Sequence, residues 1–288
     1  MSAPKTRRRI RTRGSLLLAI AVLAFGLSAC YPAGKPVPPA SQPLQGFDAA
    51  CAPTLDKMTT WWSSSPYTRA GIYLGGSSVY CKSQMQPWLT SSWVTSVVNQ
   101  GWKLIPIWVG PQAPCTTLGD VTTIANDPNT AYTAGVTEAY NAAVRAAGLG
   151  MRTGPIYYDM EAYPIGATCT AVVQEFAKGW AAGLHFFGHT AGYYSSLCSG
   201  IKDLAASPDA GSMDSIWAAA WPYNSDDARY GTYVPNLFGM TCGAVVTPPD
   251  NYWWNHQRLR QFRGGHDETW GAATINIDTN ATDGATYP

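Results

Sequence analysis

Eight short apolar runs recur between residues 46 and 288, and segments of helical composition separate most of them. The runs predict strands, and the segments between them predict helices. Strands that alternate with helices indicate an α/β fold, in which a parallel sheet closes into a single-domain (β/α)8 TIM-type barrel. An open doubly wound sheet is the alternative, which the lack of a Gly-rich phosphate loop in the first βα turn weakens. The expected strands cover residues 46–49, 70–75, 103–109, 155–161, 190–194, 215–221, 258–262 and 273–278.

Helices are expected over residues 54–63, 90–100, 130–147 and 168–184. The helical signal fades over residues 223–255, where Pro, Asn and Asp indicate a long loop.

The first 30 residues have the features of an export signal. Six basic side chains lie within residues 5–13, and an apolar run over residues 16–27 follows them. That run is too short for a membrane-spanning helix, which needs about 20 residues. Leu27-Ser28-Ala29-Cys30 resembles a bacterial lipobox, in which Cys30 becomes the lipidated first residue. An ordinary signal peptide with an incidental cysteine is the alternative, and the arginines fit either a twin-arginine signal or the general secretion route.

Residues 31–45 contain five prolines and predict a semi-rigid tether to the folded domain at 46–288. Removal of the signal takes six basic residues from the chain, which leaves 13 Lys and Arg against 18 Asp and Glu, a net charge of −5. This balance disfavours nucleic acid as a partner, because nucleic-acid binding depends on basic side chains that neutralise phosphates. We expect an exported monomer, either anchored on the outer face of the membrane by its lipid alone or secreted.

Six cysteines remain after Cys30, and none of them forms a CxxC pair. An even number in an exported chain predicts three disulfides rather than a metal site. One cysteine follows each of the first six strands, so all six are expected in loops on one face of the barrel. Neighbouring loops would pair as Cys51–Cys81, Cys115–Cys169 and Cys198–Cys242, which is one of 15 possible connectivities.

Two acids, Asp159 and Glu161, end the apolar strand over residues 155–161. Side chains alternate along a strand, so these two point the same way, about 6–7 Å apart. Asp48 and Asp278 also end predicted strands, and the first and eighth strands are neighbours in a closed barrel. Four carboxyl groups are therefore expected to converge at the carboxyl ends of the strands.

Carboxyl groups in this arrangement suit the cleavage of a glycosidic bond. We assign Glu161 as the proton donor, because it reaches furthest beyond its strand. Asp159 and Asp278 are candidates for the ionised partner, and Asp48 for substrate positioning or pKa tuning. Strand spacing alone leaves retention and inversion of stereochemistry open.

A divalent cation held by the same four acids is a weaker alternative, because no histidine accompanies them at ligand spacing. We expect neither a metal nor a cofactor. Aromatic side chains near the strand ends can stack on sugar rings and favour a glycan groove. The residues expected to contact substrate, two amides included, are Trp108, Gln112, Tyr158, Tyr194, Trp217, Trp221 and Gln261.

Five motifs occur in order along the chain: Gly46-Phe47-Asp48, Tyr158-Asp159-Met160-Glu161, Ile216-Trp217-Ala218-Ala219, Gln261-Phe262 and Ile277-Asp278-Thr279-Asn280. Together they resemble the strand motifs of family 25 glycoside hydrolases, which are lysozymes that act on peptidoglycan. Three longer runs are more similar still to an actinobacterial branch of secreted, glycoside-hydrolase-like domains of unknown function. They are Gly46-Phe47-Asp48-Ala49-Ala50-Cys51-Ala52-Pro53, Gly71-Ile72-Tyr73-Leu74-Gly75-Gly76 and Leu104-Ile105-Pro106-Ile107-Trp108-Val109-Gly110-Pro111-Gln112. The resemblance implies that Asp48, Asp159, Glu161 and Asp278 match the active-site carboxylates of the lysozymes, with Glu161 as the proton donor.

The sequence departs from the lysozyme pattern after the third strand, where residues 110–115 read Gly-Pro-Gln-Ala-Pro-Cys. The substrate groove is therefore expected to differ. A glycoside hydrolase that acts on a cell-envelope glycan is the leading hypothesis. A non-catalytic glycan-binding or envelope-remodelling lipoprotein on the same scaffold is the rival.

Overall fold

The computed structural model describes residues 43–224, 227–228, 230 and 233–288. The predicted export signal, the lipobox with Cys30 and most of the predicted tether lie outside the described residues. Among the residues described, no helix has both the length and the apolar character that crossing a membrane requires.

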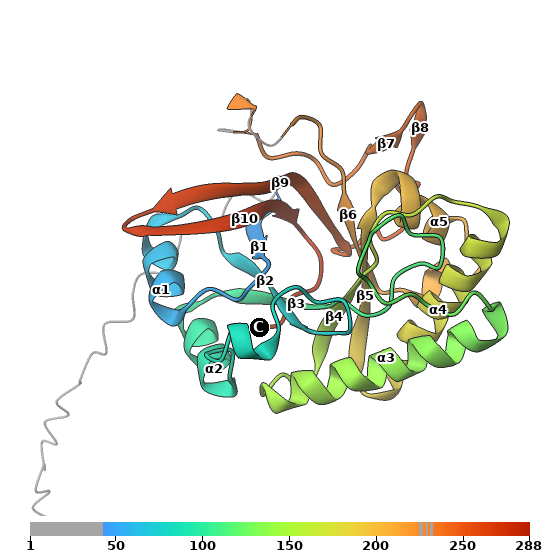
Figure 1. Ribbon diagram of the computed structural model, residues 1–288. Helices are drawn as coiled ribbons and strands as arrows, with labels where there is room; N and C mark the ends of the chain where they lie inside the picture. The colour runs from blue at the N-terminus through green and yellow to red at the C-terminus, as the bar shows by residue number, and fades with distance from the viewer. Residues whose placement is uncertain (1–42, 225–226, 229, 231–232) are drawn as a thin grey trace, which may run out of the picture. The chain divides into compact units, whose positions relative to one another are not determined.

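Eight strands close into one barrel in the order β1-β10-β9-β6-β5-β4-β3-β2 (Figure 1), which confirms the predicted barrel. The separate pair of short strands, β7 and β8, forms a hairpin outside it. The predicted tether extended to residue 45, but Leu44 and Gln45 are the first residues of β1. The barrel strands are β1 (Leu44–Ala49), β2 (Arg69–Gly75), β3 (Lys103–Trp108), β4 (Gly154–Asp159), β5 (His189–Ser196), β6 (Ser215–Ala219), β9 (Arg258–Trp270) and β10 (Ala273–Thr282). The hairpin strands are β7 (Thr241–Cys242) and β8 (Val245–Val246).

The prediction that every strand is parallel is wrong for the last one. β10 pairs antiparallel with both β9 and β1, whereas the other neighbours are parallel. The chain reverses between Trp270 and Ala273 at Gly271, whose φ of 58° suits a tight hairpin turn. No helix can fit in so short a connection, so the barrel closes through a hairpin.

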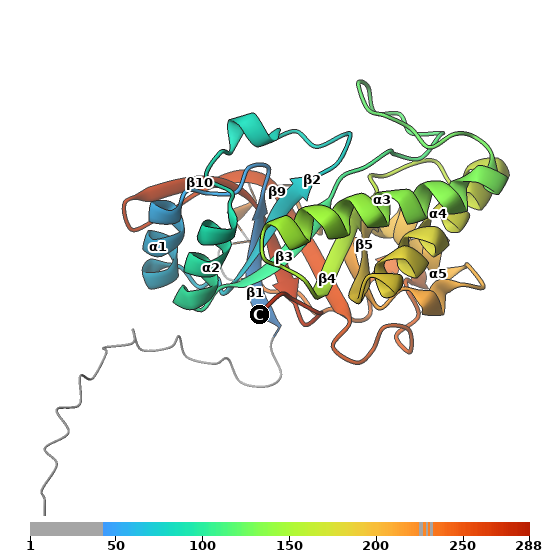
Figure 2. The same cartoon turned by 90° about the horizontal axis from the view of Figure 1, so that it is seen from below.

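Helices cover the outside of β1 to β5 (Figures 1 and 2), and local signals explain their ends. The Thr90 side chain accepts a hydrogen bond from the Trp93 amide at the start of α2, and Gly101 ends this helix with a φ of 112°. Asp127 caps α3, with Pro128 at its first position. The helices are α1 (Leu55–Ser64), α2 (Ser91–Gln100), α3 (Pro128–Gly148), α4 (Ala167–Phe186) and the short α5 (Lys202–Ala205). Shorter helical turns are η1 (Ser83–Met85), η2 (Leu197–Ile201) and η3 (Ala210–Ser212).

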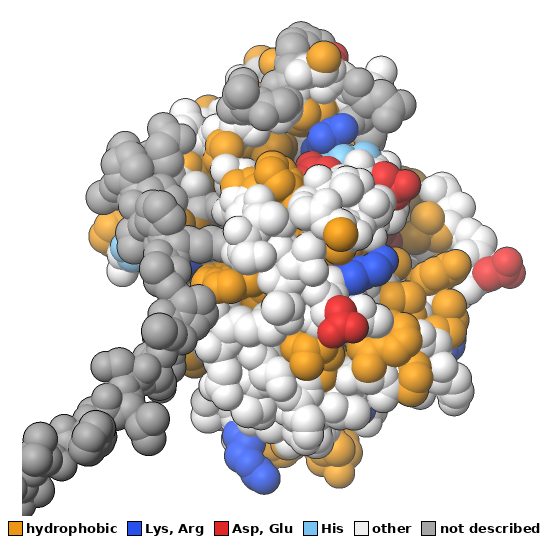
Figure 3. Space-filling view, turned by 90° about the vertical axis from the view of Figure 1, so that its left-hand side faces the viewer, with side chains coloured by type: hydrophobic (Ala, Val, Ile, Leu, Met, Phe, Trp, Pro, Cys, Tyr) orange, Lys and Arg blue, Asp and Glu red, His pale blue; other side chains and the backbone are white. Residues whose placement is uncertain are grey.

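The barrel strands bury side chains on both faces. Ile105, Ile107, Tyr157, Trp217 and Leu259 pack in the barrel interior. The alternating residues pack outward against the helices in a larger apolar layer. Charged side chains are few and scattered on the face in Figure 3, in keeping with the 13% of charged residues in the chain. A core of this kind fixes the strand ends, on which the candidate site depends.

Three disulfides join the loops at the carboxyl ends of the strands. They pair Cys51 with Cys81, Cys115 with Cys169, and Cys198 with Cys242. All three expected pairings are therefore confirmed. Each bridge links the connections that follow two neighbouring strands, so the mouth of the barrel is braced on several sides.

Replacing Cys115 and Cys169 together by Ser should lower the free energy of unfolding by about 2–4 kcal/mol, because this bridge closes a loop of 54 residues in the unfolded chain. Denaturant unfolding of the oxidised protein measures the loss. Replacing the exposed Ser92 by Ala is the control and should change the unfolding free energy by less than about 0.5 kcal/mol. An unchanged unfolding midpoint in the double variant would contradict the bracing role of this bridge.

Candidate active site

A pocket of about 430 Å³ opens at the carboxyl ends of the strands, and all four predicted acids line it. Asp48 comes from β1, Asp278 from β10, and Asp159 ends β4. Glu161 lies two residues beyond β4. The four side chains therefore converge on one pocket as predicted, even though β10 runs opposite to the expected direction.

Asp48 and Asp278 lie directly opposite each other in the β1–β10 pairing. One buried amide connects them: Gln261 Nε2 lies 3.3 Å from Asp48 Oδ2 and 3.0 Å from Asp278 Oδ2. Asn280 Nδ2 also donates to Asp48 Oδ2 at 2.7 Å. These amide donors hold the two carboxyl groups in place and favour the charged form of Asp48.

The segment from Asp159 to Glu161 is held by Gln112, which follows β3. Gln112 Nε2 donates to the Asp159 carbonyl oxygen at 2.9 Å, and Gln112 Oε1 accepts from the Glu161 amide at 2.7 Å. Gln112 also lines the pocket, as expected of a residue near substrate. Its amide group is committed to the backbone, so its main contribution is to position Glu161.

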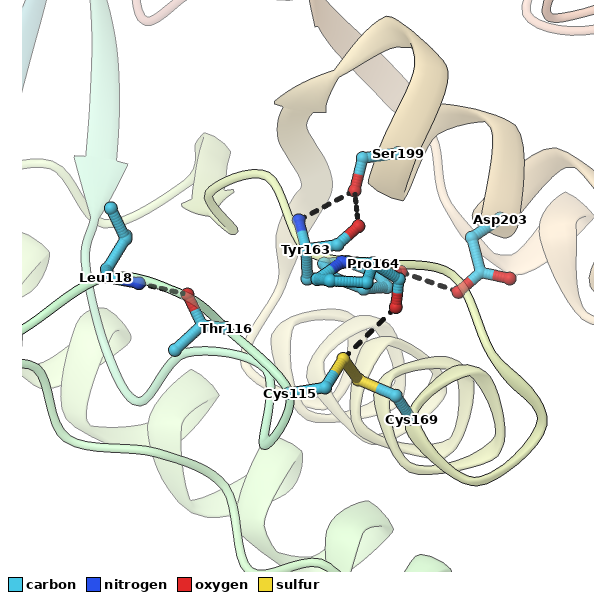
Figure 4. Close-up of a disulfide and its surroundings, with 8 residues drawn as sticks. All are labelled: Cys115, Thr116, Leu118, Tyr163, Pro164, Cys169, Ser199 and Asp203. Carbon is cyan, nitrogen blue, oxygen red and sulfur yellow. Dashed lines mark hydrogen bonds between the residues drawn. A yellow bond between two sulfur atoms is a disulfide. The ribbon is translucent and has the colours of Figure 1, made fainter.

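Further contacts hold the loop after Glu161 (Figure 4). Ser199 Oγ accepts from the Tyr163 amide at 2.8 Å and donates to the Tyr163 carbonyl oxygen at 2.6 Å. The Tyr163 hydroxyl donates to Asp203 at 2.6 Å. The Cys115–Cys169 bridge passes beside this loop, with Cys115 Sγ lying 3.2 Å from the Pro164 carbonyl oxygen. The loop that presents Glu161 is thus fixed from both sides.

Burial and mutual repulsion favour the protonated forms of the pocket acids. Burial raises the pKa of Asp278 to about 8, and the charges of Asp48 and Glu161 add to this effect. Burial raises the pKa of Asp48 to about 6, although hydrogen bonds from Asn280 and Gln261 oppose the shift. Burial also raises the pKa of Glu161, and burial together with the charge of Glu161 raises the pKa of Asp159 well above its ordinary value.

Two residues expected to contact substrate face away from the pocket. Trp108 points toward α3, where its indole nitrogen donates to Glu138 at 2.6 Å. The ring of Tyr158 packs against Phe176 and Trp180 of α4. Those two predictions are wrong for one reason: residues next to Ile107, Tyr157 and Asp159 on their strands must point to the outer face of the barrel.

Four further residues that were expected to contact substrate lie under the pocket or beside it. Tyr194 and Gln261 are buried below the acids, with the Tyr194 hydroxyl donating to Gln261 Oε1 at 2.9 Å. Trp217 is buried deeper, and its indole donates to Asn280. Trp221 is 51% exposed and donates to the same Gln261 oxygen at 3.2 Å, at the edge of a neighbouring cavity.

Tyr73, which lines the pocket from β2, was not predicted from the sequence. Burial and nearby carboxyl groups, that of Asp159 first among them, raise the pKa of Tyr73, so its hydroxyl keeps its proton. Two exposed rim residues, Tyr80 and Leu118, were also missed. Strand alternation could have identified Tyr73, because it lies two residues from Gly71, which pairs with Asp48.

The four acids do not form a metal site by geometry. Within the part of the chain that the structure describes, no group of three or more His, Cys, Asp and Glu side chains is arranged to hold a metal ion. The arrangement instead suits proton transfer, since neighbouring carboxyl groups with different pKa values can act as acid and base.

Asp278→Asn should stabilise the protein at pH 8 and leave its stability nearly unchanged at pH 4. The pKa of Asp278 rises from 3.8 to about 8 on folding, so the folded state binds more protons between these values and loses stability as the pH rises. Removing this charge should raise the free energy of unfolding at pH 8 by about 1–2 kcal/mol. Thermal unfolding at both pH values measures the effect.

The exposed Asp56 of α1 provides the matched control, because Asp56→Asn removes the same charge outside the pocket. This variant should show no stabilisation at pH 8. Equal responses of Asp278→Asn and Asp56→Asn would contradict the proposed repulsion among the pocket acids.

Comparison with known proteins places this chain in a family. A model of the Rv2525c-like, glycoside hydrolase-like domain matches residues 60–282. No curated protein matches the sequence. Among solved structures, an uncharacterised protein of B. stearothermophilus is 18% identical with a TM-score of 0.52, over 83% of this chain and 95% of that one.

The Tat-secreted protein Rv2525c of Mycobacterium tuberculosis, in complex with L-tartrate, is 14% identical with a TM-score of 0.51, over 84% of this chain and 95% of that one. A family GH25 lysozyme from Aspergillus fumigatus is 13% identical with a TM-score of 0.46, over 84% and 94%. The first two likenesses concern the fold, whereas the family match covers most of the sequence. The chain therefore belongs to the family of Rv2525c-like, glycoside hydrolase-like domains.

Proposed function

We propose that this protein is an exported glycoside hydrolase that acts on a cell-envelope glycan such as peptidoglycan. The observation that carries the proposal is the set of four carboxyl groups with raised pKa values around one pocket at the barrel mouth. Membership of the glycoside-hydrolase-like family supports it. Glycosidic cleavage needs one protonated and one ionised carboxyl group, and such a pocket supplies both.

Glu161 is the proposed proton donor. It lies beyond the end of β4, lines the pocket and is partly exposed, while burial raises the pKa of its carboxyl. A raised pKa favours the protonated form of this carboxyl, which can protonate the leaving glycosidic oxygen. The two hydrogen bonds of Gln112 to this segment fix the direction from which the proton is delivered.

The negative charge in the pocket is best stabilised at Asp48, which accepts hydrogen bonds from Gln261 and Asn280. A fixed carboxylate there stabilises positive charge on the sugar ring in the transition state. Asp159 and Asp278 are the candidates for attack on the sugar or for activation of water. Tyr73 lines the same pocket and favours the charged form of Asp159.

Glu161→Gln should reduce glycan hydrolysis by at least about 100-fold, the usual contribution of a general acid. The purified protein is incubated with peptidoglycan and with α- and β-glucans, and new reducing ends are measured. Glu138→Gln is the matched control, since Glu138 is also partly buried with a raised pKa but lies on α3 outside the pocket. This control should keep full activity.

Binding of glycan without release of reducing ends, equal in the native protein and in Glu161→Gln, would reject the enzyme. That outcome would favour the non-catalytic glycan-binding lipoprotein on the same scaffold. Equal loss in Glu161→Gln and Glu138→Gln would reject Glu161 as the specific donor.

We also propose that the chain is exported and anchored through Cys30, on the strength of the basic and apolar segments before it and the lipobox-like Leu27-Ser28-Ala29-Cys30.

Cys30→Ala should move the protein from the membrane fraction to the soluble fraction. Immunoblotting of the two fractions measures this shift. An unchanged distribution would contradict lipidation of Cys30.

A further inference from the structure

Exposed aromatic side chains lie at the end of the barrel opposite the carboxyl pocket. Phe186 is 83% exposed and Phe187 is 37% exposed. They end α4, just before β5 begins at His189. Trp254, 64% exposed, precedes β9 in the same way. Because β4, β5, β6 and β9 are parallel, the segments that lead into these strands share the end away from the mouth.

An apolar groove continues from this end along the outside of the helices. The groove lies between α3 and α4, with a volume of about 560 Å³, and Tyr140, Phe186 and Phe187 line it. The rings of Tyr140 and Phe187 are 5.6 Å apart, and those of Phe186 and Phe187 are 5.1 Å apart. Adjoining exposed aromatic rings of this kind indicate a binding surface. We call Tyr140, Phe186, Phe187 and Trp254 the aromatic end surface.

The chain enters the barrel at the same end. Gly46 of β1 pairs with Arg69, the first residue of β2, so the start of β1 lies away from the mouth. In Figure 2 the loops after β2 and β3 lie at the top, and the C-terminus lies at the opposite end. Residues 31–43 separate Cys30 from β1 and can span at most about 45 Å. A lipid on Cys30 would therefore tether the barrel by this end, within about 45 Å of the bilayer.

Charge at this end also suits a bilayer that contains anionic lipids. Lys103 begins β3, and the exposed Arg152 precedes β4. Asp214, which precedes β6, lies 2.6 Å from His185, so part of the negative charge here has a partner. Interfacial contact is strengthened when aromatic side chains and basic groups occur together.

We propose that the aromatic end surface rests on the membrane interface and points the carboxyl pocket away from the bilayer, toward the envelope glycan. The proposal rests on the anchoring of Cys30 proposed above. The lipid attaches the protein, and the aromatic side chains set its orientation, since Trp, Tyr and Phe side chains favour the boundary between headgroups and acyl chains.

The test measures binding of unacylated protein, carrying Cys30→Ala, to vesicles of equimolar phosphatidylglycerol and phosphatidylethanolamine by flotation. The unacylated protein should bind weakly but measurably. Adding Phe186→Ser should lower its partition coefficient by about tenfold, since a large apolar ring is lost from the interface. Tyr80→Ser is the matched control, because Tyr80 is 75% exposed and lines the pocket at the opposite end. This control should leave vesicle binding unchanged.

Unacylated protein that does not float with the vesicles, or that floats equally well with Phe186→Ser, would overturn the proposal. So would a native dimer that Phe186→Ser converts to a monomer without any change in vesicle binding, because a second copy would then cover the surface. Thermal unfolding should be unchanged in Phe186→Ser, since the side chain is exposed. Vesicle binding needs no lipid on Cys30 and no hydrolysis, so its outcome is separate from the tests of anchoring and activity.

Discussion

Repulsion among buried carboxyl groups is the constraint on which the rest of the candidate site depends. Asp48 and Asp278 face each other across two paired strands, and Asp159 and Glu161 approach from β4 and the loop after it. Such a cluster is costly to bury, and its cost is met by amide donors from Gln261, Asn280 and Gln112 and by retained protons. The same retained protons are what a glycosidase needs to protonate a leaving group.

The barrel fold holds the four pocket carboxyl groups close together. Strand pairing fixes Asp48 opposite Asp278, and disulfides brace the loops on either side of the pocket. Gln261 accepts from Tyr194 and Trp221 through one oxygen, so its nitrogen must face the two aspartates. Little rearrangement is then required when charge develops during the reaction, which is the condition for effective electrostatic stabilisation.

Much of this could be predicted from the sequence, because the signals were local. Strand periodicity placed Asp159 and Glu161 on one side, and cysteines after successive strands gave the three disulfide pairs. The antiparallel course of β10 could not be predicted, since an apolar run carries no direction. Strand alternation already excludes Tyr158 from the pocket, because this residue adjoins the inward-pointing Asp159. Placing Trp108 on the outer face also requires the register of β3 against β4, which depends on tertiary packing.

The most direct test of the central claim is a carboxyl titration followed by carbon NMR of the Asp and Glu side chains. Our account predicts that Asp278 and Glu161 titrate above their ordinary values of 3.8 and 4.5, with Asp278 near pH 8. It also predicts that Glu161→Gln lowers the pKa of Asp278, because one repelling charge is gone. Titration of all four pocket acids at ordinary values would contradict the account, since the pocket would then hold no proton to donate near neutral pH.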